Sequence, residues 1–138
     1  MAGSIDLVAR KVVCLSLLYY ACDISLVPDH EFDLWCKRLY EEWDDLEPVR
    51  QWQLAPREDI RASGFHVKVT LAAAHAAIHW ADKAQKTNLH IGIKSDWRDS
   101  EYGRWLPCDA FMRVDPPRKK RNVRPKAGRS PEGAERAS

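Results

Sequence analysis

The residues of this sequence best suited to bind a ligand lie close together, between positions 19 and 33. Two adjacent tyrosines, Tyr19 and Tyr20, are followed nine residues later by Asp29, and then by Phe32 and Asp33. Aromatic rings can stack on a base, and the free N–H groups at the start of a helix can hold a phosphate. The alternative is an ordinary helical hairpin whose aromatic side chains belong to the core.

Two helices joined by a short connector are expected to position these residues. Apolar side chains recur at helical spacing over residues 5–21, and Ser4 is a suitable cap for that helix. A second helix is expected over residues 29–46, with Asp29 as its N-cap. Because the connector of residues 22–28 is short, the two helices should pack antiparallel. The apolar stripe of the second helix consists of Phe32, Trp35, Cys36, Leu39, Tyr40, Trp43 and Leu46.

The rest of the chain gives weaker signals. Residues 47–62 contain two prolines and are expected to form a connecting segment with one helical turn near residues 57–61. Alternating apolar residues predict short strands over residues 65–69 and 88–93, which could pair as a two-stranded ribbon. Residues 94–111 are expected to be irregular chain held down by aromatic side chains.

Between the two expected strands, Thr70 should cap a third helix over residues 71–86, because its alanine-rich start favours helix strongly. The residues expected to face the core are Leu71, Ala74, Ile78 and Ala81. The predicted fold is therefore mainly α, an antiparallel helical hairpin plus a third helix, with a minor two-stranded β ribbon. The hairpin covers about residues 5–47 of a helical domain that spans residues 1–113, and residues 63–111 extend it.

The charge is unevenly distributed along the 138 residues, whose net charge is +2. Residues 114–138 carry eight Lys and Arg against three acids, a net charge of +5, which leaves the first 113 residues at −3. Because Pro, Gly, Ser and Arg dominate this tail, we expect it to be disordered. No apolar run approaches the roughly 20 residues that span a bilayer, and no secretory signal is evident. The four cysteines lack CxxC spacing, which favours reduced thiols in a cytoplasm.

Histidines are the only residues whose spacing suggests a metal. His75 and His79 are four residues apart and would share one helix face, and His66 or His90 could add a ligand. The pattern lacks the glutamate of HExxH, and no cysteine pair completes a site. Partly buried structural histidines are therefore the favoured interpretation. No phosphate-binding loop or nucleophile elbow is present, so no catalytic residue is predicted.

A fixed pattern runs through the two expected helices and consists of Tyr19-Tyr20, Pro28-Asp29, Glu31-Phe32-Asp33 and Leu46-Glu47. It resembles the N-terminal helical domain, domain Ia, of bacterial NAD-dependent DNA ligases. That domain has a tyrosine pair or Tyr-His, about nine residues, a [SP]-D-x-E-Y-D-x-L block and a helix that ends in L-E. The resemblance covers about a third of the chain.

The resemblance implies a site for the nicotinamide mononucleotide half of NAD. Tyr19 would stack on the nicotinamide ring, and Tyr20 and Phe32 would border the phosphate and ribose. Asp29 and Asp33 would accept hydrogen bonds from ribose hydroxyls or the carboxamide. Two carboxylates repel a phosphate, so nearby cations are needed, and the sequence offers Lys37 and Arg38.

The sequence departs from the ligase pattern in two respects, and both argue against ligase activity. Phe32 replaces the usual tyrosine and removes a hydroxyl, and no K-x-D-G adenylation motif is present. The resemblance therefore implies a non-catalytic binding module, not a ligase. Its partner would be NAD, nicotinamide mononucleotide, a nucleotidyltransferase or another replication or ligation protein. Short proteins of this kind look like those encoded by bacteriophages, which would place the chain in the host cytoplasm.

A hypothesis of another class assigns the function to the basic tail. Its cations could contact DNA or RNA phosphates without reading sequence, and no aromatic residue is interleaved to stack on bases. The alternative is a solubilising or partner-binding tail. The candidate contacts are Arg118, Lys119, Lys120, Arg121, Arg124 and Lys126.

The tail hypothesis predicts nucleic-acid binding that depends steeply on salt. Six phosphate contacts would lower the affinity by about a thousandfold between 50 and 200 mM salt, because each contact releases counterions. Fluorescence anisotropy with labelled DNA and RNA measures this, and truncation after Val114 should abolish the signal. Binding that survives truncation, or that ignores salt, would exclude the tail as the contact.

Overall fold

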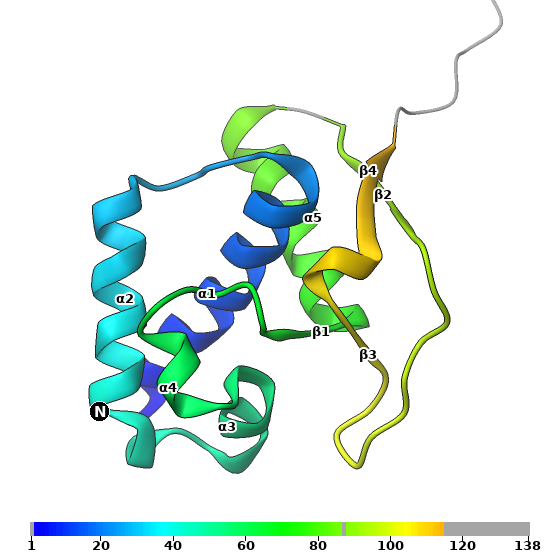
Figure 1. The fold of residues 1–138 in the computed structure, drawn as a ribbon. Coiled ribbons are helices and arrows are strands. Elements are labelled where there is room, and N and C mark those ends of the chain that lie inside the picture. The colour runs from blue at the N-terminus through cyan, green and yellow to red at the C-terminus, as the bar shows by residue number, and fades with distance from the viewer. Residues whose placement is uncertain (1, 87, 115–138) are drawn as a thin grey trace, which may run out of the picture.

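The computed structural model describes residues 2–86 and 88–114. The fold is mainly helical with two small two-stranded antiparallel sheets, which confirms the predicted fold class. The longest helix, α1 (Ala2–Cys22), packs against α2 (Asp29–Glu41) on one side and α5 (Leu71–Gln85) on the other (Figure 1). The predicted helical hairpin is thus formed by α1 and α2, and the predicted third helix, α5, packs on α1 as well.

The middle of α1 is buried on all sides. Every residue from Val12 to Leu18 is buried, and Ser16 is the one polar residue among them. A helix that is apolar all round is stable only inside a core. The middle of α1 is covered by helices on several sides, by one strand of each sheet and by a 3-10 turn. The helix begins at Ala2, so Ser4 lies within it and is not its cap, contrary to expectation.

The second helix is shorter than the sequence predicted. α2 starts at Asp29 but ends at Glu41, and a 3-10 turn, η1 (Trp43–Asp45), takes the chain on to Leu46. A helix end is negatively polarised, so the acids that follow destabilise further helical turns. These acids are Glu42, Asp44 and Asp45, and Glu41 adds a further one at the helix end itself. The stripe still packs on α1, with Cys36, Leu39 and Leu46 buried.

The connection after Leu46 contains a helix that the sequence analysis missed. α3 (Pro48–Leu54) starts with proline at its first position, where the missing N–H costs nothing. The expected turn near residues 57–61 is confirmed as α4 (Arg57–Ile60). Both short helices bury apolar residues against the core, with Leu54 and Ile60 fully buried.

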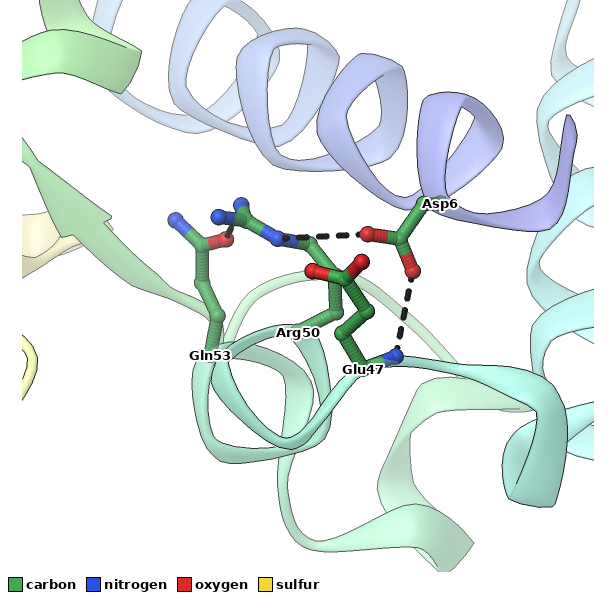
Figure 2. A network of polar contacts seen from close by, with 4 residues as sticks. All are labelled: Asp6, Glu47, Arg50 and Gln53. Carbon is green, nitrogen blue, oxygen red and sulfur yellow. Dashed lines mark hydrogen bonds and ion pairs between the residues drawn. The ribbon is translucent and has the colours of Figure 1, made fainter. Parts of the chain in front are cut away.

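A buried polar network ties α3 to the start of α1 (Figure 2). Asp6 Oδ1 accepts a hydrogen bond of 3.2 Å from the backbone N–H of Glu47, which precedes α3. The other oxygen, Oδ2, lies 4.0 Å from Arg50 Nε, and Arg50 donates a hydrogen bond to Gln53. Asp6 therefore satisfies a backbone donor of a helix 41 residues away in the sequence.

The strand pairing differs from the prediction. β1 (Lys68–Thr70) pairs antiparallel with β3 (Trp105–Pro107), and β2 (His90–Ile93) pairs antiparallel with β4 (Phe111–Val114). The predicted ribbon between the β1 and β2 segments is therefore wrong. β3 comes from residues 94–111, which were expected to be irregular, and β4 starts at the last residue of that segment, Phe111.

The third helix, α5, follows the prediction at its start. Thr70 is its N-cap, and its hydroxyl accepts a hydrogen bond of 3.2 Å from the N–H of Ala73. Its core face consists of Ala74, Ala77 and Ala81. Leu71 was expected to face the core but is 53% exposed, whereas Ile78 is partly buried against the core, as expected. Small side chains allow α5 to approach α1 closely.

Within the part of the chain that the structure describes, no helix combines the length and apolar character needed to cross a membrane. The predicted basic tail lies outside the described residues apart from Val114, which ends β4.

The Asp6 network predicts a measurable loss of stability on substitution. Asp6→Ala should lower the free energy of unfolding by about 1–3 kcal/mol, because the Glu47 N–H and the Arg50 guanidinium lose their partner. Urea unfolding followed by circular dichroism measures the change. Asp44→Ala, an exposed acid of η1, is the control and should stay within about 0.5 kcal/mol of wild type. Equal effects in both variants would contradict a capping role.

Candidate functional site

A pocket of about 200 Å³ lies where α1 ends and α2 begins. All five residues predicted to bind a ligand line it, namely Tyr19, Tyr20, Asp29, Phe32 and Asp33. The connector between the helices forms a second wall, with Ile24, Leu26 and Val27. The structure therefore brings together every residue of the predicted nucleotide site.

The two tyrosines of the pocket wall are exposed. Tyr19 is 49% exposed and Tyr20 is 38% exposed, so neither belongs to the core. Their rings meet edge to face with centroids 5.0 Å apart, and Tyr20 meets Phe65 in the same way at 5.0 Å. Such pairs fix ring orientation. Tyr20 is held between two rings, and the half-exposed ring of Tyr19 remains open to a ligand.

A left-handed residue turns the chain from the tyrosines into the connector. Asp23 has φ +57°, a conformation that aspartate tolerates better than most residues. The next residue, Ile24, donates its N–H to the carbonyl of Leu18 at 3.0 Å. Ile24 is thereby buried in the wall of the pocket, and α1 ends at Cys22, two residues after its tyrosine pair.

The acidic residues of the pocket lie on the first two turns of α2. Pro28 occupies the N-cap position, with no side-chain capping bond, so the predicted capping role of Asp29 is wrong. Asp29 is instead the first helical residue, where a carboxylate still interacts favourably with the helix dipole. Asp33 follows one turn later, and both carboxylates are exposed. Phe32 is partly buried against the core beside them.

A third wall comes from a segment far away in the sequence. Ala62 and Ser63 also line the pocket, and Ser63 hydrogen-bonds with the phenol of Tyr20. Gly64 follows and packs directly on α1, because a Cβ on it would overlap with Ser16 Oγ and lie 3.1 Å from Phe32 Cζ. No sequence signal pointed to this wall, since its contact with α1 is long-range.

Burial shifts the pKa of two groups at this site, the Tyr20 phenol and the Cys36 thiol. Burial raises the pKa of the Tyr20 phenol, although its hydrogen bond with Ser63 acts in the opposite direction. The phenol is therefore protonated at neutral pH and able to donate a hydrogen bond. Burial also raises the pKa of the Cys36 thiol, behind the pocket on α2, to about 12, so this thiol carries no charge.

The two cations that the sequence offered near the site have different roles. Arg38 donates from Nε to Glu42 at 2.8 Å, one turn along α2, and does not line the pocket. Lys37 lines a second hollow that adjoins the pocket through Asp33 and Ala62. Arg61, which was not among the cations expected near the site, lines the same hollow.

The other candidate groups are not brought together. His75 and His79 are exposed on α5, His90 lies on β2, and His66 Nε2 is 2.6 Å from the carbonyl oxygen of Leu54. Among residues 2–86 and 88–114, no three His, Cys, Asp or Glu side chains lie close enough to hold a metal ion. The predicted nucleic-acid contacts of the tail lie outside the described residues, so that hypothesis stays a prediction.

Comparisons with protein-family models, with curated proteins and with solved structures give no match to this chain.

The contact between Gly64 and α1 predicts a specific stability defect. Gly64→Ala should destabilise the protein by about 1–3 kcal/mol, because the added methyl group overpacks the wall of the pocket against Ser16. Ser16→Ala alone should be nearly neutral, since its buried hydroxyl has no hydrogen-bond partner in the described chain. Urea unfolding of both single variants and the double variant measures the coupling.

In the double variant, Ser16→Ala should restore part of the stability that Gly64→Ala loses, because it removes the hydroxyl oxygen with which the added methyl group overlaps. Strictly additive effects would show that Gly64 does not pack on Ser16 in solution.

Proposed function

We propose that this chain is a binding module that takes up the nicotinamide ring of a nicotinamide nucleotide, without catalysing a reaction itself. The observation that carries the proposal is the convergence of Tyr19, Tyr20, Asp29, Phe32 and Asp33 on one pocket. These residues were selected from a sequence pattern that resembles domain Ia of NAD-dependent DNA ligases. A core role for the tyrosine pair would have buried it, whereas both rings are exposed at the pocket.

The size and the lining of the pocket suit a single heteroaromatic ring. Its volume of about 200 Å³ is below the roughly 300–1,000 Å³ typical of pockets for drug-sized ligands. A ring held against the half-exposed Tyr19 gains stacking energy and apolar burial. Asp29 and Asp33 provide acceptors for an amide or hydroxyl group, and the phenol of Tyr20 provides a donor. The remainder of a dinucleotide would extend outside the pocket.

Binding without chemistry agrees with the state of the potential nucleophiles. All four cysteines are buried and unpaired. Burial raises the pKa of Cys14 and Cys22 to about 11 and that of Cys36 and Cys108 to about 12. A thiol is nucleophilic as the thiolate, and these thiols stay protonated at neutral pH.

The resemblance also suggests how the module acts. In the ligases, this domain closes over the mononucleotide half of NAD while another domain transfers the adenylate. We infer that the present module presents a nicotinamide nucleotide to a nucleotidyltransferase or to another replication or ligation protein. Because Phe32 replaces the usual tyrosine, one hydroxyl is missing from the site, and the affinity should be lower than with the full set of donors.

Isothermal titration calorimetry with nicotinamide mononucleotide, NAD and AMP tests the proposal. The first two should bind and AMP should not, since AMP lacks the nicotinamide ring. Asp33→Ala should weaken binding by at least about tenfold, because a charged hydrogen-bond acceptor is lost. Asp33 is exposed, so the melting temperature should hardly change.

Glu31→Ala is the matched control, because Glu31 lies on the same first turns of α2 but does not line the pocket. It should leave the affinity within about twofold. Absence of heat with every ligand would refute the proposal, and a large loss of stability in Asp33→Ala would make Asp33 a structural residue.

A further inference from the structure

Two histidines lie on the solvent-facing side of α5. His75 and His79 are both exposed, whereas the alanine face of the helix packs on the core. In the part of the chain that the structure describes, neither imidazole has a hydrogen bond, an ion pair or a ring contact. His66 is different, because its Nε2 lies 2.6 Å from the carbonyl oxygen of Leu54. A structural role would give the two exposed rings such partners, so both remain available to a ligand.

The spacing of the pair places both rings over one patch of surface. Residues four apart in a helix lie on the same face, about 6 Å from each other along the axis. Imidazole nitrogen is a preferred ligand of Zn²⁺, Ni²⁺ and Cu²⁺, so two rings one turn apart can hold a single ion as a chelate. Since no hydrogen bond within the described chain locks either ring, both can rotate toward a shared ion.

The helix that carries the pair is held by the fold itself. Its N-cap, Thr70, accepts a hydrogen bond of 3.2 Å from the N–H of Ala73, and its alanine face is buried where it packs on α1. The two histidines therefore keep their spacing whether or not an ion is bound. A chelate on such a preformed element loses little conformational entropy on binding.

The surroundings of the pair contain few competing charges. Within residues 71–81 of α5, the two histidines are the only ionisable side chains. Ala72 and Ala76 lie on the same exposed side, and their small side chains leave room for an ion with its bound water. Lys83 lies one turn after His79 and is the nearest cation on the helix. Its repulsion lowers the affinity of the pair for an ion.

We propose that His75 and His79 form a bidentate site for a divalent transition ion, such as Zn²⁺ or Ni²⁺, whose other coordination positions are held by water. Among residues 2–86 and 88–114, no group of three His, Cys, Asp or Glu side chains could hold a metal ion, so the pair has no third protein ligand there. The carboxylate of α5, Asp82, accepts a hydrogen bond of 2.8 Å from the N–H of Leu89. The site is thus open to solvent, unlike the closed four-ligand sites of structural zinc. It is independent of the pocket, to which α5 contributes no residue.

Isothermal titration calorimetry of the untagged full chain with ZnCl₂ and with NiCl₂ tests the site. One ion should bind per chain, and His75→Ala or His79→Ala should weaken binding at least about tenfold, because a single imidazole replaces the chelate. The ion binds the folded helix, so it should raise the melting temperature of wild type and hardly change that of either variant. Both residues are exposed and alanine favours helix, so the variants should stay folded.

Two controls separate a chelate from binding to histidines in general. His30→Ala removes an exposed histidine from α2 and should keep the affinity within about twofold. Ala76→His combined with His79→Ala keeps five histidines in the chain but places two of them at adjacent positions, which do not face each other. This double variant should bind as weakly as His79→Ala alone.

Each contrary result has a definite meaning. Wild-type affinity in either single variant or in the double variant would refute the chelate, and absence of heat with both salts in wild type would refute the site. One ion per two chains, with a dimer in size-exclusion chromatography coupled to light scattering, would refute the open site, because a second copy would then supply the missing ligands.

Discussion

The burial of α1 is the constraint on which the rest of the structure depends. Its middle is apolar on every side, so no single neighbouring helix can remove it from water. α2 and α5 pack on it together with α3, and a strand of each sheet and the 3-10 turn η2 (Cys108–Ala110) complete the cover. The small sheets are therefore part of this cover, since two-stranded ribbons are marginal by themselves.

The pocket forms where this burial ends. The last turn of α1 leaves the core at Tyr19 and Tyr20, and the chain turns away at the left-handed Asp23. Gly64 packs directly on Ser16 of α1, and the preceding residues Ala62 and Ser63 line the pocket. The packing that buries α1 thus also positions the residues that line the pocket.

Charged residues divide into two groups with different physical roles. Asp6, Arg50 and Gln53 are largely buried and paired, and they join distant helices as a structural network (Figure 2). Along the exposed face of α2, Asp33 and Lys37 have no such partners in the described chain and border the two hollows. Paired buried charges fix the fold, and unpaired charges beside a hollow are free to contact a ligand.

The sequence by itself determined the features that depend on neighbouring residues. The helical periods, the cap at Thr70, and the closeness of Tyr19 to Asp33 across a short connector all follow from local spacing. Only the tertiary structure decided which strands pair and which segment closes the pocket at Ala62. These choices depend on contacts between residues tens of positions apart, whose energies come from burial against α1 and leave no local pattern.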